Sequence, residues 1–297
     1  MSLTATSAMP QQHKGRGILL YSLAIFLLAV MDASAKWLTH GYPVGEIIFF
    51  RSLFALPILL VLGLRHSSAP ARLLATAHPW RHLLRGLVVL VTIVTFFIAL
   101  RHLPLATVTV ITLSNPVFML LLSLLWLGER VGRRQWMAVT LGLLGVLVVC
   151  GWSGLQFNIY SLLAVASALS YALASLLTRQ LSATDSPATI AMLGTLIMLL
   201  VSALTAGSDW QLPGWGDWLV LLLLGLSGGL ANFVNALSLR YVQLSAVAPL
   251  EYSILLWAAA LGYLFFGEMP GITTWLGGAL IIASGVVVAR EKNEGRQ

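Results

Sequence analysis

The hydrophobic pattern of this chain occurs twice, and the second copy begins 139 residues after the first. The clearest landmarks are two turns, Gly128-Glu129 in LWLGERVGRRQW and Gly267-Glu268 in LFFGEMPGITTW. The same offset relates Leu100-Arg101 to Leu239-Arg240. An internal repeat in a membrane chain is typical of a transporter, because two related halves can rock about a shared site.

The composition places the chain in a membrane. Charged residues make up 9% of it and apolar residues 59%, whereas a soluble domain has about 25% charged residues. The sequence predicts an all-α integral membrane protein with ten transmembrane helices, because ten apolar stretches are long enough to cross the hydrocarbon core. They lie near Gly17–Leu38, Val44–Leu64, Leu83–Leu100, Pro104–Leu127, Arg134–Gly151, Phe157–Thr178, Pro187–Ala206, Trp218–Leu239, Leu244–Phe266 and Ile272–Arg290.

The ten spans divide into two halves of five. Because five is odd, the second half enters the membrane from the side opposite to the first, which gives inverted repeats. We therefore predict a single membrane domain over residues 1–297, with a first five-helix repeat over 17–151 and a second, inverted repeat over 157–290.

The net charge of +7 is explained by orientation in the bilayer rather than by nucleic acid. If both termini are cytoplasmic, the inner loops and tails hold 14 of the 17 basic residues, in keeping with the positive-inside rule. These are Lys14, Arg16, Arg65, Arg72, Arg81, Arg85, Arg130, Arg133, Arg134, Arg179, Arg240, Arg290, Lys292 and Arg296. We predict a multi-pass protein with both termini in the cytoplasm and the lipid bilayer as its surroundings.

The ten spans, the five-plus-five repeat and the Gly-Glu turn after the fourth span of each half resemble the EamA-type carriers of the drug/metabolite transporter superfamily. The resemblance covers nearly the whole chain. It implies a carrier of small metabolites in a bacterial inner membrane, often an exporter. Within the superfamily, the chain is most similar in general character to the amino-acid exporters of the aromatic amino-acid type.

Ionisable groups inside spans are the first candidates for a transport pathway, because they are costly to bury in a bilayer. Asp32 and Lys36 lie four residues apart on one face of the first span. Either they neutralise each other while Lys36 reaches water, or they face the substrate. The repeat favours the second interpretation, because the matching positions hold Tyr171 and Ser175 and do not repeat the charges.

Three further ionisable residues lie within predicted spans. Glu46 is near the start of the second span, where the helix dipole favours an anion and a structural role is expected. Arg51 lies deeper in that span and is a candidate for binding a substrate carboxylate. Glu251 follows Pro249, which can kink a helix; it is either a proton or amine site or a packing hydrogen bond.

Polar and aromatic side chains on spans one, three, four, six, eight and nine suggest a central cavity. The alternative is that they only join helices to one another. Together with Asp32, Lys36, Arg51 and Glu251, the predicted substrate-binding residues are Thr95, Asn115, Tyr171, Asn232, Tyr252 and Trp257.

Several functions are disfavoured by what the sequence lacks. It contains no P-loop, no hydrolase or metalloprotease motif and no histidine cluster with metal-ligand spacing. We therefore expect no enzyme activity, no cofactor and no bound metal.

Buried charges of both signs favour a zwitterionic substrate. We predict a secondary transporter that exports small metabolites and works as a monomer. Amino acids are the first candidates for its substrate. The alternatives are a carrier of phosphorylated or nucleotide-linked sugars and, more distantly, a passive channel.

The predicted topology can be tested by thiol labelling. In a chain with Cys150 replaced, cysteines at Ser67 and Ser208 should react with an impermeant thiol reagent from opposite sides, Ser208→Cys from outside, because an odd number of spans separates the two loops. Labelling of both positions from the same side would contradict the inverted-repeat topology.

Overall fold

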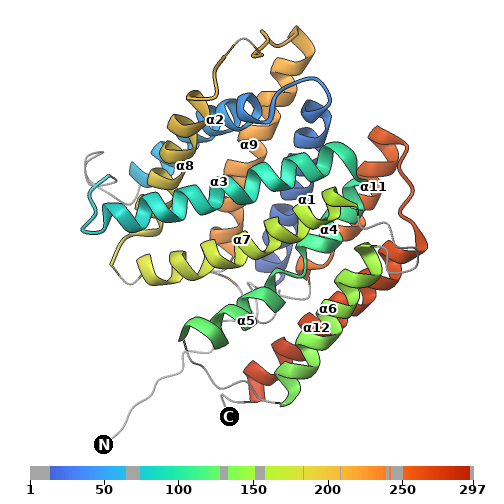
Figure 1. Ribbon diagram of the computed structural model, residues 1–297. Coiled ribbons are helices and arrows are strands. Elements are labelled where there is room, and N and C mark those ends of the chain that lie inside the picture. The colour runs from blue at the N-terminus through green and yellow to red at the C-terminus, as the bar shows by residue number, and fades with distance from the viewer. Residues whose placement is uncertain are drawn as a thin grey trace, which may run out of the picture.

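The computed structural model describes residues 14–64, 74–127, 133–150, 158–182, 184–207, 209–238, 241 and 250–294. The positions Ser67 and Ser208 lie outside these ranges. Within them every regular element is a helix (Figure 1), and the bounds are α1 (Lys14–Thr39), α2 (Val44–Leu64), α3 (Pro79–His102), α4 (Leu105–Thr112), α5 (Asn115–Leu127), α6 (Arg133–Cys150), α7 (Ile159–Leu181), α8 (Pro187–Ala203), α9 (Trp215–Ser238), α11 (Ile254–Phe266) and α12 (Ile272–Glu294).

The helices confirm the predicted all-α membrane architecture. By length and composition, six helical segments can cross a membrane, one of which runs through α4 into α5. Four shorter apolar helices complete the ten spans, and they lie in α6, α8, α11 and α12.

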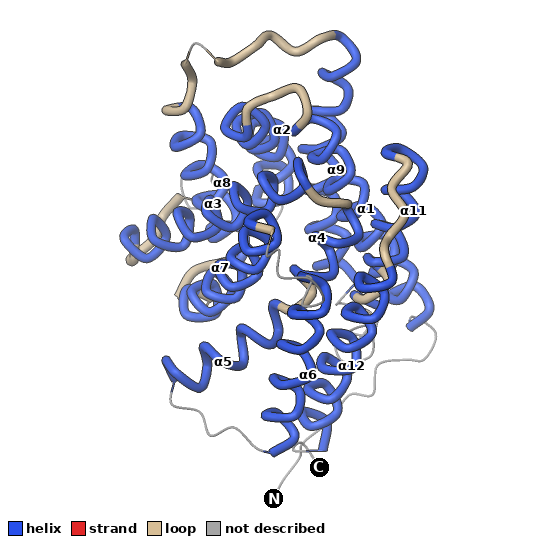
Figure 2. Tube along the Cα trace, turned by 45° about the vertical axis from the view of Figure 1, so that its right-hand side comes forward, coloured by secondary structure: helices blue, strands red, loops and turns tan. Residues whose placement is uncertain are grey.

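The packing follows the repeat. The most extensive contacts are those of α6 with α12, α1 with α9, α3 with α7, and α2 with α8. Under the repeat α1 corresponds to α7 and α3 to α9, so the pair α1–α9 maps onto the pair α7–α3. The pairs α2–α8 and α6–α12 each map onto themselves, and Figure 2 shows α6 and α12 side by side. Each half is therefore packed mainly against the other half.

The fourth span is not the continuous helix that the sequence predicts. It is broken at Leu113 and Ser114, between α4 and α5. Pro116 has no amide hydrogen to donate to the carbonyl of Thr112, which removes a hydrogen bond at this point. The Ser114 hydroxyl donates instead to the carbonyl of Ile111 at 2.6 Å.

The second half has a break at the matching place. The chain is helical at Leu250 and Glu251, turns at Tyr252 and Ser253, and becomes helical again in α11. Tyr252 and Ser253 lie 139 residues after Leu113 and Ser114. Paired breaks in corresponding helices are typical of transporters built from inverted repeats.

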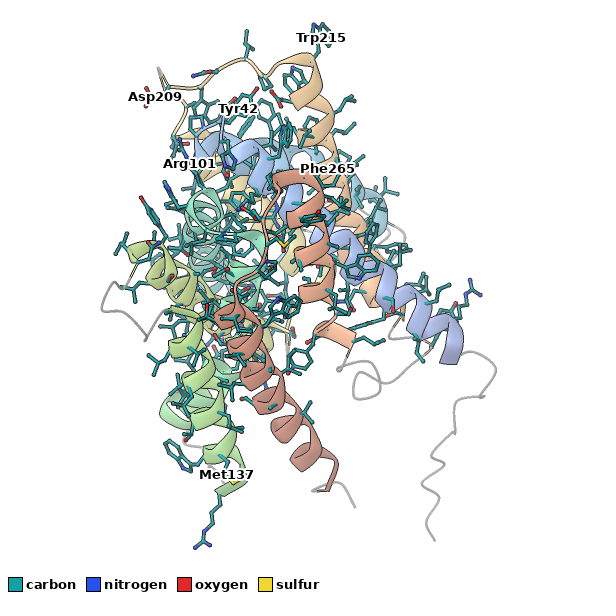
Figure 3. All side chains as sticks on the ribbon, turned by 90° about the vertical axis from the view of Figure 1, so that its right-hand side faces the viewer. Tyr42, Arg101, Met137, Asp209, Trp215 and Phe265 are labelled. Atoms are coloured by element: carbon teal, nitrogen blue, oxygen red, sulfur yellow. The ribbon has the colours of Figure 1, made fainter. Side chains whose placement is uncertain are left out.

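One end of the bundle is closed by its main hydrophobic core. Leu38, Leu100 and Leu105 are fully buried where α1 and α3 end and α4 begins. Figure 3 shows Tyr42, which follows α1, at this end with Trp215, and Met137 of α6 at the opposite end. On the predicted topology the closed end is the outer one.

Candidate functional site

A cavity of about 1130 Å³ lies between α2, α3, α8 and α9. Arg51 and Gly225 line it at mid-helix, and Gly63 and Pro187 line it where α2 ends and α8 begins. These two helix ends lie away from the closed end of the bundle, because α2 starts just after Tyr42 and runs away from it. The cavity therefore extends from the middle of the bundle toward the end that is predicted to face the cytoplasm.

Three glycines of α9 allow α1 and α2 to pack closely against α9 beside this cavity. A Cβ at Gly225 would lie 3.2 Å from the carbonyl oxygen of Arg51, one at Gly228 would lie 2.8 Å from the sulfur of Met31, and one at Gly229 would lie 2.9 Å from Ile58. Small residues at helix interfaces permit such approach in membranes. The glycines thus hold the α2 backbone at Arg51 against the middle of α9.

The Arg51 guanidinium lines the cavity with few partners. Its Nη2 donates to the sulfur of Met31 at 3.7 Å, and thioether sulfur is a weak acceptor. Asp32 attracts Arg51 electrostatically, but among the described residues no carboxylate makes a salt bridge with Arg51. Among the described residues, no other acceptor takes the remaining guanidinium N–H donors.

Arg85 brings a second guanidinium to the same cavity. Its Nε donates to the Thr178 hydroxyl at 2.7 Å and its Nη1 donates to the carbonyl of Ile190 at 3.2 Å. Nη1 lies over Gly194, where a Cβ would be only 2.6 Å away. Side chain and backbone groups of α7 and α8 therefore fix the orientation of an arginine that belongs to α3.

The polar lining of the cavity is basic. Its described lining includes Arg16, Arg51 and Arg85 and no aspartate or glutamate. Asn232 also lines it, with Nδ2 donating to the carbonyl of Gly228 at 2.9 Å. Such a cavity attracts anionic groups of a solute.

At the closed end a buried ion pair joins the two halves. Lys36, only 2% exposed, places Nζ 2.6 Å from Glu268 Oε1 and donates to the carbonyl of Leu103 at 2.5 Å. Glu268 Oε2 accepts from the amide of Leu105 at 2.9 Å. This arrangement corrects the expected pairing on the first span, because Lys36 does not reach water and pairs with Glu268 rather than Asp32. Lys36 does not line the described cavity, and its role in substrate binding stays a prediction.

A second set of contacts closes the same end over α2 and α9. The Tyr42 hydroxyl donates to Asp217 at 2.7 Å and accepts from the amide of Gly214 at 3.2 Å. Burial, followed by the hydrogen bond to Asp217, raises the pKa of Tyr42 above its usual value, so the phenol remains a donor. Glu46 accepts from the amide of Gln211 at 3.2 Å, which agrees with its expected structural role.

Near the opposite end of the bundle, a polar cluster fastens α3 to the segment before α8. His82 Nε2 lies 2.9 Å from Asp185 Oδ2, which also accepts from the Thr76 hydroxyl at 2.9 Å. The hydrogen bond with His82 lowers the pKa of Asp185 below its usual value. His82 itself is buried in the first turn of α3.

The structure brings the predicted binding residues together in two groups. Arg51 and Asn232 line the cavity, with Asp32 near Arg51. Elsewhere, Glu251 accepts from Tyr21 at 2.7 Å and lies close enough to Tyr171 for electrostatic interaction.

The remaining predicted residues lie outside the described cavity. The Trp257 ring packs edge-on against Phe26 at 4.9 Å. Thr95 donates to carbonyls of its own helix, Asn115 begins α5, and Tyr252 lies against Gly285. Roles in substrate binding for the predicted residues stay predictions.

The sequence-based search missed Arg85. This residue lies within α3, half-buried on the cavity wall, and was counted among the basic residues of the inner loops. The available signal was its distance from the helix end: Arg85 stands six residues after Pro79, where α3 begins.

Two packed repeats, paired helix breaks and a cavity that ends at mid-membrane are typical of membrane transporters. The EamA-like transporter family model matches residues 15–151 and again residues 158–290. The chain therefore belongs to the EamA-like transporter family.

Several known proteins are similar to it over most of their length. The pseudopaline exporter of Pseudomonas aeruginosa is 31% identical over 278 residues, covering 93% of this chain and 96% of the exporter. A riboflavin transporter of Vibrio cholerae is 30% identical, covering 92% of this chain and 93% of that protein. An S-adenosylmethionine uptake transporter of Rickettsia bellii is 28% identical, covering 88% and 91%.

One solved crystal structure aligns with a TM-score of 0.62 at 20% identity, covering 93% of this chain and 98% of that chain. At this identity the likeness shows the fold alone. The relatives include exporters and uptake transporters for different solutes, so they define a carrier of small metabolites and do not support a specific assignment to aromatic amino acids.

The Lys36–Glu268 pair can be tested by a double-mutant cycle. Lys36→Met and Glu268→Gln should each lower the free energy of unfolding by about 3–5 kcal/mol, because each leaves a buried charge or its partner uncompensated. The double variant should lose less than the sum of the two. Stability is measured by denaturant titration of the detergent-solubilised protein.

Arg101→Gln serves as the control for that cycle, because Arg101 is an exposed cation at the end of α3. It should change stability by no more than about 0.5 kcal/mol. Strictly additive losses in the Lys36 and Glu268 variants would mean that the two side chains do not stabilise each other.

Proposed function

We propose that this protein is a secondary carrier that exports amino-acid-like zwitterions by alternating access, and that the structure represents its inward-open state. The observation that carries the proposal is the position of Arg51 on the cavity wall, without a salt bridge to any described residue and with Asp32 nearby. Arg51 binds the carboxylate of the solute, and Asp32 attracts its ammonium group.

Closure at one end supports alternating access over a passive channel. The ion pair of Lys36 with Glu268 and the contacts of Tyr42 with Asp217 lie at the end of the bundle opposite the cavity mouth. A channel in its conducting state needs a continuous path, whereas a carrier exposes its site to one side at a time. In the proposed cycle, these contacts separate when the cavity closes on the other side.

The known relatives are compatible with this substrate class. S-adenosylmethionine, which the Rickettsia relative is named for taking up, carries an α-amino acid group with both charges. The pseudopaline relative is named as an exporter, which supports the proposed direction. The Vibrio relative is named as a riboflavin transporter. Riboflavin has no such group, so that relative must bind its solute through other contacts.

The competing proposal is a phosphorylated or nucleotide-linked sugar. The basic lining of the cavity would suit a phosphate. Asp32 favours the zwitterion, since a carboxylate beside Arg51 would repel a phosphate dianion and attract an ammonium group.

Transport in proteoliposomes tests the proposal. A labelled amino acid mixture and a labelled sugar phosphate are offered with and without a pH gradient. We expect saturable amino-acid flux that unlabelled substrate on the other side accelerates. Arg51→Gln should reduce this flux at least about tenfold, because loss of one partner of a buried charge pair costs about 2–5 kcal/mol in affinity.

Arg101→Gln, which removes an exposed arginine outside the described cavity lining, is the matched control and should transport normally. Flux of the sugar phosphate alone would replace the proposal by its competitor. Flux that neither saturates nor responds to substrate on the other side would favour a channel.

A further inference from the structure

We propose that Arg51 and Arg85 form a two-point anion site, so that the solute is an amino-acid derivative carrying two carboxylates. This inference rests on the proposed export of zwitterions and narrows its substrate class. A solute with one carboxylate can bind Arg51 but leaves the guanidinium of Arg85 without an anionic partner.

The acidic residues of the chain are already occupied elsewhere. Five of them accept hydrogen bonds or make ion pairs with groups other than the two arginines, namely Glu46, Asp185, Asp217, Glu251 and Glu268. Glu251 also lies near Tyr171, which interacts electrostatically with Arg85. Of the chain's ten acidic residues, only Glu129, Glu291 and Glu294 have side chains outside the described part, and they belong to the first Gly-Glu turn and the C-terminal tail. Asp209 lies at the end of the bundle that carries Tyr42 and Trp215 (Figure 3), and Asp32 is the acidic residue that interacts electrostatically with Arg51.

Both arginines lie in the membrane-spanning bundle, where an uncompensated guanidinium is unfavourable. Among the described residues, Arg51 has the Met31 sulfur as its hydrogen-bond acceptor, and Arg85 has two neutral oxygens, those of Thr178 and Ile190. Neutral acceptors satisfy hydrogen bonds but do not cancel charge. Among the described residues no carboxylate makes a salt bridge with Arg85, so a solute anion can supply its counter-charge.

Arg85 is prepared for this role by its anchors. Its Nε and Nη1 are held by α7 and α8, while its Nη2 has no partner among the described residues. A guanidinium fixed in this way loses little conformational freedom when it binds a carboxylate, and its planar shape matches that anion. Because the anchors come from the second half, a solute that joins Arg51 to Arg85 also joins the two halves.

The size of the cavity agrees with a solute larger than a simple amino acid. At about 1130 Å³ it is slightly larger than the usual range for ligand pockets, about 300–1,000 Å³. It therefore has room for two separated carboxylates with an ammonium group near Asp32. Such a solute carries a net negative charge, which the basic lining accommodates.

Paired probes that differ by one carboxylate test the inference. Binding to the purified protein in nanodiscs is compared for L-glutamate and L-glutamine, and for γ-glutamylglycine and its glycine amide. In at least one pair the dicarboxylate should bind at least about tenfold more tightly, which corresponds to 1.4 kcal/mol. Arg85→Gln should reduce the affinity of that dicarboxylate at least about fivefold more than the affinity of its amide.

Two variants keep this test interpretable. Arg85→Lys retains the charge without the planar fork, so it should keep part of the preference. Arg81→Gln removes an exposed arginine one turn earlier on α3 and should keep all of it. Elution of each variant as a single species shows that it is folded.

The outcomes separate this inference from the proposed function. Equal binding of both members of each pair, with loss of both in Arg51→Gln, would overturn the two-point site and leave zwitterion transport standing. A preference for O-phosphoserine over serine without any for glutamate over glutamine would overturn the second carboxylate. Binding of none of these probes would contradict both proposals.

Discussion

The buried ion pair of Lys36 with Glu268 is the contact on which the observed state depends. It joins α1 of the first half to the turn after α11 of the second, and both charged groups also bind the backbone at the α3–α4 connection. A buried pair is favourable only when its remaining hydrogen-bonding groups are satisfied. Here the backbone groups of Leu103 and Leu105 supply these partners, so the ion pair forms only when the helices meet at this end.

The repeat shows why the two ends differ. The position equivalent to Lys36 in the second half is Ser175, whereas the position equivalent to Glu268 in the first half is Glu129. Ser175 donates to the carbonyl of Tyr171 within its own helix at 2.8 Å. The position related to Lys36 by the repeat therefore holds no cation. This difference in sequence agrees with a cavity that opens at the end opposite the Lys36–Glu268 ion pair.

Much of the architecture was predictable because hydropathy and the repeat are strong signals. Ten apolar stretches and the 139-residue offset gave the all-α fold and its two halves. The break in the fourth span was missed because its apolar run continues through Leu113 and Ser114, and hydropathy does not register a lost hydrogen bond. The break at Tyr252 lies three residues after Pro249, where the sequence does predict a kink.

The site was less predictable because its contacts join residues far apart in sequence. Arg51 stood out as a charge inside a span. Lys36 was matched to Asp32, which is one turn away, whereas its partner Glu268 is 232 residues away. Arg85 looked like an inner-loop cation, since nothing in the sequence shows that Thr178 and Ile190 hold it against the cavity.

Thiol accessibility of the cavity tests whether the structure is an inward-open state. In a chain with Cys150 replaced by alanine, a cysteine at Ala191 on the cavity wall is exposed to an impermeant thiol reagent in inside-out and right-side-out vesicles. We expect the reagent to modify this cysteine from the cytoplasmic side only. When Lys36 is also replaced by methionine, the reagent should reach the cysteine from the outside as well. Modification of the Ala191→Cys chain from the outside, with Lys36 intact, would contradict an inward-open state.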